Sequence, residues 1–313
     1  MEDYFNTTLS ELQKIDLYPF VGKHFEIQLK RDDLIDELVS GNKWRKLKYN
    51  VEKALHLNAE GLITFGGAHS NHLIATAKAC SVVGIKSIGF VRGEELNQFA
   101  NPTLKQCAAF GMELIFISRA EYKLKDEKFY KDDIKLGYPN YFLVPEGGSN
   151  YYGAIGCQEI NKELPQGITD IVLSAGTGTT AAGLLLGAKD FQKIHVVSAL
   201  KGDWMQDEVA QLLKYITFDN ETVDDLLKQA NFIYSAHRGG YAKIDASILN
   251  LIRSFYKTYG VRLDAIYTAK TMLWLIEEIK KNKFTEEQNI VFLHTGGVQG
   301  MDYLMTKKKI NLF

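Results

Sequence analysis

Residues 170–187 read DIVLSAGTGTTAAGLLLG and contain the pattern that decides the fold. The first part, DIVLSAG (170–176), is almost entirely apolar, as expected of a strand that is buried on both faces. A turn rich in glycine and threonine follows, and TTAAGLLLGAKD (179–190) then predicts a helix. A strand that turns through glycine into a helix is the repeating unit of a parallel α/β sheet.

The same order of strand, glycine turn and helix recurs along the chain. Because the strands are apolar throughout and alternate with helices, they predict parallel sheets that helices cover on both faces. The number of strands exceeds what one compact open sheet usually carries, so two sheets are expected. The polar segment 119–133 interrupts the order and is predicted to be a surface excursion. Strands are predicted at 61–67, 85–93, 112–118, 141–148, 170–176, 193–200 and 289–297, and helices at 70–84, 102–111, 151–164 and 179–190.

Length and composition indicate a globular protein of enzyme size. The chain has 313 residues, of which 46% are hydrophobic and 24% charged, and its net charge is -1. This balance gives no electrostatic argument for nucleic acid or an anionic membrane surface as a partner. No signal-peptide pattern is visible near the N-terminus, and the apolar runs are shorter than the roughly 20 residues that span a bilayer.

The cysteines indicate a reducing compartment. Cys80, Cys107 and Cys157 are odd in number, widely spaced and without a Cys-x-x-Cys pair. They predict buried free thiols, which fit a reducing environment. Together with the N-terminal sequence, they predict a cytoplasmic protein.

The loop SAGTGTT (174–180) is the strongest candidate for an anion site. Backbone N–H groups and the positive end of a helix dipole meet where the buried strand ends and the helix begins, so a phosphate suits the site. The segment from Gly176 to Ala181 also matches the dinucleotide pattern G-x-G-x-x-A. However, it lies in mid-chain, and the following strand runs into Lys201 rather than an acidic ribose partner. A glycine turn that only permits close packing is a third possibility.

Three further loops at strand ends are rich in glycine and polar residues: FGGAHSNH (65–72), PEGGSN (145–150) and HTGGVQG (294–300). His69 and His72 could share a helix face, but no cluster of carboxylates or cysteines completes a metal site. Helix capping is therefore favoured, and no metal is predicted. The chain has no G-x-S-x-G motif, which argues against a serine hydrolase.

A phosphate site without a nucleotide motif suggests pyridoxal phosphate as the cofactor. This cofactor needs a phosphate site, a lysine for a Schiff base and a partner for its ring nitrogen. The stretch SGNKWRKL (40–47) supplies a candidate lysine, Lys43, close to Arg45 and Lys46. Out of context Lys43 would be a solvated lysine at a helix start, but the strand-end loops favour a chemical role. A lysine must be neutral to attack, and burial beside other cations lowers its pKa.

Taken together, these motifs resemble a known family. GNKWRKL resembles the Gly-Asn-Lys-x-Arg-Lys-Leu segment of the pyridoxal-phosphate enzymes that include D-cysteine desulfhydrases and 1-aminocyclopropane-1-carboxylate (ACC) deaminases. The resemblance continues in order over nearly the whole chain, through GGAHSNH, PEGGSNYYGAIG, SAGTGTTAAG, HRGGYAKID, LDAIYTAK and HTGG. It implies the tryptophan synthase β-like fold (fold type II), an α/β fold of two three-layer α/β/α domains. Their sheets would be mainly parallel, with the cofactor in the cleft between the domains.

The resemblance also implies a domain division and an assembly. Residues 1–45 and 154–313 would form a larger cofactor-binding domain, and residues 46–153 a smaller α/β domain. Members of the family are usually homodimers that act on small amino acids, so a homodimer and such a substrate are expected.

The resemblance implies roles for individual residues. Lys43 would form the Schiff base with pyridoxal phosphate, and either Lys43 or Tyr267 would take the proton from the substrate Cα. The catalytic residues would be Lys43, Ser70, Tyr241 and Tyr267. The substrate would contact Ser70, Asn71, His72, Tyr241 and Tyr267. The cofactor would contact Lys43, Lys46, Asn71, Gly176, Thr177, Gly178, Thr179, Thr180, Thr268 and Thr295.

Two positions favour one activity within the family. ACC deaminases typically have Glu after the second tyrosine and Leu in a His-Leu-Gly-Gly motif, whereas this chain has Thr268 and Thr295 there, as desulfhydrases tend to have. ACC has no α-proton, so opening its ring profits from a carboxylate that keeps the cofactor ring nitrogen protonated. D-Cysteine has an α-proton and a good leaving group, so a neutral hydroxyl suffices. Elimination from D-cysteine is therefore expected, with ACC deamination as the alternative.

Some positions depart from the family pattern. Ile74 stands where many relatives have arginine, the phosphate loop reads Thr-Gly-Thr-Thr rather than Ser-Ala-Gly-Thr, and HRGGYAKID lacks a proline. These departures leave room for another D- or β-substituted amino acid as the substrate. Two hypotheses from other classes are an NAD-dependent oxidoreductase that uses the G-x-G-x-x-A match and a non-catalytic protein that binds a ligand in its cleft.

Overall fold

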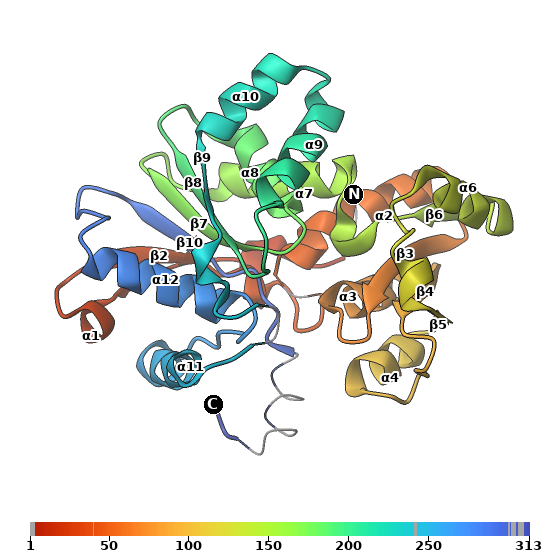
Figure 1. The fold of residues 1–313 in the computed structure, drawn as a ribbon, viewed down its shortest axis with the longest axis horizontal. Coiled ribbons are helices and arrows are strands. Elements are labelled where there is room, and N and C mark those ends of the chain that lie inside the picture. The colour runs from red at the N-terminus through yellow and green to blue at the C-terminus, as the bar shows by residue number, and fades with distance from the viewer. Residues whose placement is uncertain (1–3, 40, 241–242, 300, 302–304, 306–309) are drawn as a thin grey trace.

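The computed structural model describes residues 4–39, 41–240, 243–299, 301, 305 and 310–313, and within them the strands form two sheets (Figure 1). The larger sheet has the order β1-β2-β10-β7-β8-β9. Strand β1 is antiparallel to β2, and the other neighbours are parallel. The strand bounds are β1 Leu12–Asp16, β2 Glu26–Lys30, β7 Asp170–Ala175, β8 Lys193–Ser198, β9 Ala230–Ile233 and β10 Ile290–Leu293.

The smaller sheet is built from one continuous part of the chain. Its order is β5-β4-β3-β6, and all neighbours are parallel. The bounds are β3 Gly61–Gly67, β4 Lys86–Arg92, β5 Met112–Ile117 and β6 Tyr141–Leu143.

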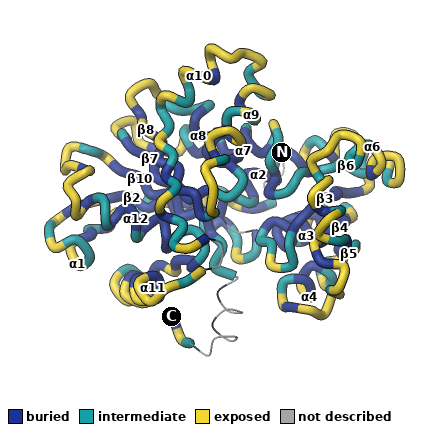
Figure 2. The backbone as a smooth tube through the Cα atoms, in the orientation of Figure 1, coloured by how far each residue is buried: buried dark blue, intermediate teal, exposed yellow. Residues whose placement is uncertain are grey.

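Helices cover both faces of the larger sheet, so its central strands β7, β8 and β10 are buried (Figures 1 and 2). On one face, α7 Tyr151–Glu163, α8 Thr179–Gly187 and α9 Met205–Thr217 pack apolar side chains against β7 and β8, and α10 Asn220–Lys228 lies outside them. On the other face lie α1 Tyr18–Val21, α11 Ala246–Tyr259 and α12 Thr268–Lys280. The two cores contain mainly Ile, Leu, Val and Phe, whose burial contributes most of the stabilisation.

The smaller sheet has the same three layers. Helices α2 Asn42–His56, α3 Asn71–Val83 and α4 Pro102–Ala109 cover one face, and α5 Arg119–Tyr122 and α6 Lys128–Gly137 cover the other. Short 3-10 helices complete the described structure: η1 Thr7–Leu9, η2 Asp32–Leu34, η3 Glu146–Gly148 and η4 Ser235–His237.

The fold class predicted from the sequence is confirmed: the chain is a mixed α/β protein with two mainly parallel sheets. Each predicted strand is present, although the strand predicted at 141–148 ends at Leu143 and continues as η3. The segment 119–133 lies at the surface as predicted, since Tyr122 is its one buried residue. It is nevertheless helical, because it forms α5 and the start of α6, which Tyr122 and Ile134 anchor against the sheet. Among the described residues, no helix has the length and apolarity needed to cross a membrane.

The domain division remains a prediction. Strands β3 to β6 all lie within residues 46–153, and the strands of the larger sheet lie outside that range. Both predicted boundaries fall inside helices, α2 and α7, which pack against each other.

The contact between α2 and α7 depends on a glycine. A Cβ atom added to Gly156 of α7 would lie 1.8 Å from the main-chain oxygen of Arg45 on α2, so any side chain here forces the helices apart. We predict that Gly156→Ala lowers the free energy of unfolding by ~3 kcal/mol, the upper end of the usual cost of overpacking.

Gly137 at the end of α6 is the matched control, because a Cβ there meets nothing within 4 Å. Gly137→Ala should leave stability unchanged or raise it by up to about 1 kcal/mol. Urea unfolding of both variants measures the difference. Equal unfolding midpoints for the two variants would contradict the contact.

Candidate active site

The start of helix α2 lies against the end of strand β10. Gly41, the residue before α2, has φ 63°, and a Cβ there would lie 1.9 Å from the main-chain oxygen of Thr295. Only glycine fits this left-handed conformation so close to another backbone. The contact brings Lys43, on the first turn of α2, to the carboxyl ends of the larger sheet's strands, where open α/β sheets bind ligands.

A buried ion network fixes α2 in this position. The guanidinium of Arg45 has no exposed surface and donates to both carboxylate oxygens of Asp32 (2.7 and 2.8 Å) and of Glu163 (2.7 and 2.9 Å). The amide N–H of Gly41 donates to the main-chain oxygen of Asp32 at 3.0 Å. Charged, bidentate contacts of this kind constrain direction as well as distance.

Lys43 is placed to act as a nucleophile. Its Nζ donates a hydrogen bond to Asn42 Oδ1 at 2.6 Å. Burial, and then repulsion by the Lys46 ammonium group, lower the pKa of Lys43 to about 7 against the weaker opposing effects of Cys157 and Asp264. A substantial fraction of the amine is therefore neutral at neutral pH, as attack on a carbonyl requires.

The N-terminus of α8 forms a site for an anion. Gly178 precedes the helix in a left-handed conformation, and no side chain caps the first N–H groups. Lys46 Nζ donates to Thr177 Oγ1 at 3.4 Å, and Thr177 and Thr179 share a hydroxyl hydrogen bond of 3.1 Å. Burial lowers the pKa of Lys46. Within the described part of the chain, neither Lys43 nor Lys46 forms an ion pair within 4.0 Å, so a bound phosphate would compensate these cations.

The side chain of Thr180 contacts Asn42, whereas the resemblance implied a contact with the cofactor. Its hydroxyl accepts from Asn42 Nδ2 at 2.9 Å and from Cys157 Sγ at 3.7 Å, and the residue is 3% exposed. Thus the side chain of Thr180 faces Asn42, and its main chain is the part that lies in the phosphate loop. No role was predicted for the side chain of Asn42, since nothing local in the sequence links residues 42 and 180.

The start of α3 carries the second polar loop. Ser70 Oγ accepts from the N–H groups of His72 (3.2 Å) and Leu73 (3.3 Å), which confirms the expected capping role. Burial and the cations Lys43 and Lys46 lower the pKa of His72 to about 3, so the imidazole is neutral. His72 Nε2 lies 2.9 Å from Thr64 Oγ1, which turns the ring toward strand β3. Among the described residues, no cluster of three or more potential metal ligands is found.

The turn before α12 holds Tyr267 and Thr268. The carboxylate of Asp264, 2% exposed, accepts from the N–H groups of Ile266, Tyr267 and Thr268, each at 2.8 Å, and from Thr268 Oγ1 at 2.8 Å. The sequence analysis did not identify Asp264.

Tyr267 faces the phosphate loop, since a Cβ on Gly176 would lie 3.3 Å from its Cε1 atom. Thr295 Oγ1 lies 3.1 Å from Ser174 Oγ. Asn71 lies near the loop after β10, where a Cβ on Gly297 would lie 3.2 Å from its Nδ2. Tyr241 lies outside the described residues.

The comparisons with known proteins agree with this geometry. The family model described as pyridoxal-phosphate dependent enzyme matches residues 2–296. The chain belongs to this family. Pyridoxal phosphate is therefore its cofactor, and the NAD-dependent alternative is wrong.

Individual relatives carry both activity names. The chain is 30% identical over 298 residues to the mitochondrial bifunctional D-cysteine desulfhydrase/ACC deaminase of Arabidopsis thaliana, covering 88% of this chain and 73% of that one. It is 26% identical to a D-cysteine desulfhydrase of Yersinia pestis (94% and 92% covered). The solved structure of an ACC deaminase homologue superposes with a TM-score of 0.79 at 26% identity (95% and 93% covered).

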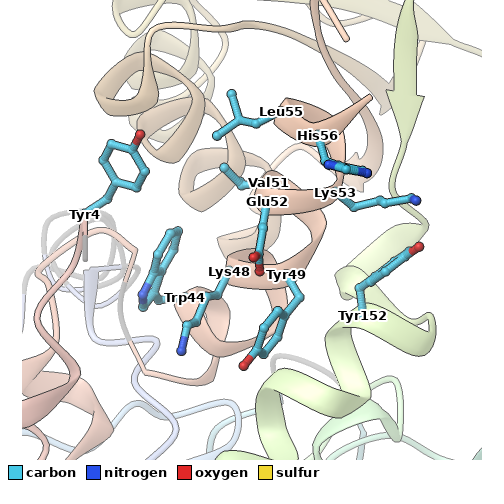
Figure 3. A pocket seen from close by; sticks show the side chains of 10 residues that line it. All are labelled: Tyr4, Trp44, Lys48, Tyr49, Val51, Glu52, Lys53, Leu55, His56 and Tyr152. Atoms are coloured by element: carbon cyan, nitrogen blue, oxygen red, sulfur yellow. The ribbon is translucent and has the colours of Figure 1, made fainter. Parts of the chain in front are cut away.

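A cavity of about 510 Å³ lies elsewhere, on the outward side of α2 (Figure 3). It shares none of its lining with the predicted catalytic, cofactor and substrate residues. The cavity is therefore separate from the residues that the resemblance predicts for the active site. The cavity is lined by Tyr4, Trp44, Lys48, Tyr49, Val51, Glu52, Lys53, Leu55, His56 and Tyr152.

The depressed pKa of Lys43 predicts a pH effect on the protein without cofactor. In the unfolded chain this lysine has its ordinary pKa of 10.5, whereas in the folded chain its pKa is about 7. Stability therefore rises with pH between these values. We predict that the melting temperature of wild-type protein rises from pH 7 to pH 10 relative to that of Lys43→Met.

Lys257→Met, which removes an exposed lysine of α11, is the control and should follow the wild-type curve. Parallel curves for the wild type and Lys43→Met would show that burial does not shift the pKa of Lys43.

Proposed function

We propose that the protein is a pyridoxal-phosphate-dependent lyase that converts D-cysteine and water to pyruvate, ammonia and hydrogen sulfide. The observation that carries the proposal is a low-pKa lysine beside an anion site, with hydroxyl groups, Thr268 and Thr295, at the two positions that discriminate within the family. The relative named as a D-cysteine desulfhydrase supports it.

Bound pyridoxal phosphate would supply an electron sink for the negative charge that develops at the substrate Cα. The first-turn N–H groups of α8, with Lys46 and residues 176–180, would hold its phosphate. Hydroxyl groups of Thr268 and Thr295 would face the ring nitrogen. These assignments follow the resemblance, and the uncapped start of α8 supports the one for the phosphate.

The remaining residues would bind the substrate and move its proton. Ser70 and Asn71 would donate to the substrate carboxylate from the start of α3, with His72 behind them as a neutral group. Lys43 would attach the cofactor and, once displaced by the substrate amine, would take the Cα proton, with Tyr267 as the other candidate base. Tyr241 would contact the substrate amino group. Within this proposal the protein acts as a cytoplasmic homodimer.

ACC deaminase is the second candidate. It rests on the relatives, because one is named for both activities and a structural neighbour is an ACC deaminase homologue. The buried carboxylate of Asp264 bonded to Thr268 adds a physical argument, since it places negative charge next to the predicted ring-nitrogen partner.

The substrate assay separates the candidates. We expect pyruvate and sulfide from D-cysteine, and little 2-oxobutanoate from ACC, at equal enzyme concentrations. L-Cysteine tests stereochemical preference. Borohydride reduction followed by peptide mass spectrometry should place the cofactor on Lys43, and Lys43→Ala should lose this label and at least about 10³-fold in activity. Formation of 2-oxobutanoate alone would replace the first proposal by the second.

The hydroxyl of Thr295 can be tested separately. Thr295→Val keeps the shape but removes the hydroxyl, and we predict an approximately tenfold lower kcat with D-cysteine, as the loss of one hydrogen bond predicts. Thr295→Ser keeps the hydroxyl and should retain most of the activity. If the valine and serine variants have the same kcat, Thr295 has no role at the cofactor ring.

A further inference from the structure

Asn42 connects Lys43 to the start of α8. It is the first residue of α2, is 5% exposed, and directly precedes Lys43. Its Oδ1 accepts from Lys43 Nζ at 2.6 Å, and its Nδ2 donates to Thr180 Oγ1 at 2.9 Å. One short amide therefore contacts both the reactive amine and the loop that ends β7.

The Lys43 end fixes the orientation of this amide. A charged lysine can only donate, so the amide oxygen must face Lys43. The amide nitrogen then faces the Thr180 hydroxyl, which accepts this bond and a weaker one from Cys157 Sγ at 3.7 Å. A flipped amide would point its N–H groups at the Lys43 ammonium and lose that contact, although the Thr180 hydroxyl could donate to the amide oxygen instead.

Other charged and titratable groups surround Lys43 but act at longer range. They come from four elements: Lys46 on α2, His72 on α3, Cys157 on α7 and Asp264 before α12. In the described part of the chain, the hydrogen bond found for Lys43 Nζ is the one to Asn42. Asn42 thus gives the amine a defined direction that the surrounding charges do not.

We propose that Asn42 is a positioning residue, whose side-chain oxygen holds the free amine of Lys43 whenever that amine is not covalently attached to the cofactor. The inference rests on the proposed role of Lys43 and extends it. A displaced lysine has four rotatable side-chain bonds, and a fixed acceptor restricts them. The amine then occupies one place from which it can take the Cα proton and attach to the cofactor again.

The test uses protein stripped of cofactor and follows the amine itself. Competitive acetylation with acetic anhydride at several pH values, quantified at the Lys43 peptide by mass spectrometry, gives the titration midpoint of this one lysine. A hydrogen bond from the charged amine to a neutral acceptor favours the charged form, and a carboxylate favours it more. We therefore expect Asn42→Asp to raise the midpoint by about one pH unit or more, and Asn42→Leu to lower it.

Two further variants complete the set. Thr180→Val removes the hydroxyl that accepts a hydrogen bond from the Asn42 amide. Like Asn42→Leu, it should lower the midpoint, but by a smaller amount. Asn58→Asp, exposed beyond the far end of α2 and about 22 Å along the helix, adds the same charge and should change nothing. Circular dichroism confirms that each variant folds, and if Asn42→Asp does not, Asn42→Leu and Thr180→Val decide.

Cofactor attachment provides the second measurement. Because a one-unit rise in the midpoint cuts the neutral fraction up to about tenfold near neutral pH, Asn42→Asp should attach pyridoxal phosphate up to tenfold more slowly at pH 7. Midpoints of Asn42→Asp and Asn42→Leu equal to that of the wild type would overturn the inference. A borohydride label on a lysine other than Lys43 would instead overturn the proposed function, while the acetylation curves would still test Asn42.

Discussion

The buried guanidinium of Arg45 is the constraint on which the rest of the site depends. It has carboxylates from two separate elements, Asp32 of η2 and Glu163 of α7, on its donor groups. Removing either carboxylate would leave two hydrogen bonds of a guanidinium without exposed surface unmade, which costs several kcal/mol, so the arrangement has few alternatives. Lys43 and Lys46 lie within one turn of Arg45, and the direction of the whole first turn of α2 follows from it.

The two lysines beside this network have the opposite property, because in the described part of the chain no carboxylate lies within 4.0 Å of either amine. Burial and mutual repulsion lower the pKa of Lys43, and burial lowers that of Lys46. The folded protein therefore holds an incomplete set of charges, which an anion at the start of α8 would complete. Functional sites often lower the stability of the folded protein, and binding of the ligand restores it. The same feature makes one amine reactive at neutral pH and makes phosphate binding favourable.

The sequence predicted the strands of the smaller sheet and β7, β8 and β10 of the larger one, because buried strands between glycine turns and helices have a strong local pattern. It did not predict β1, β2 and β9, which contain exposed polar positions, and β1 pairs antiparallel at an edge. At the site, Lys43 and the phosphate loop were recognisable from motifs. The roles of Asn42 and Asp264 were not, because they depend on the partner that each side chain meets, and the partner of Asn42 is 138 residues away.

The pairing of β2 with β10 has a consequence for the order of assembly during synthesis. The smaller sheet is contiguous in sequence, so it can form as soon as its residues leave the ribosome. The larger sheet joins residue 28 to residue 291, and Gly41 rests on Thr295, so neither contact can form until nearly the whole chain is made. The contacts that carry Lys43 to the end of β10 are therefore late products of folding, and the surroundings predicted for pyridoxal phosphate are complete only in a finished chain.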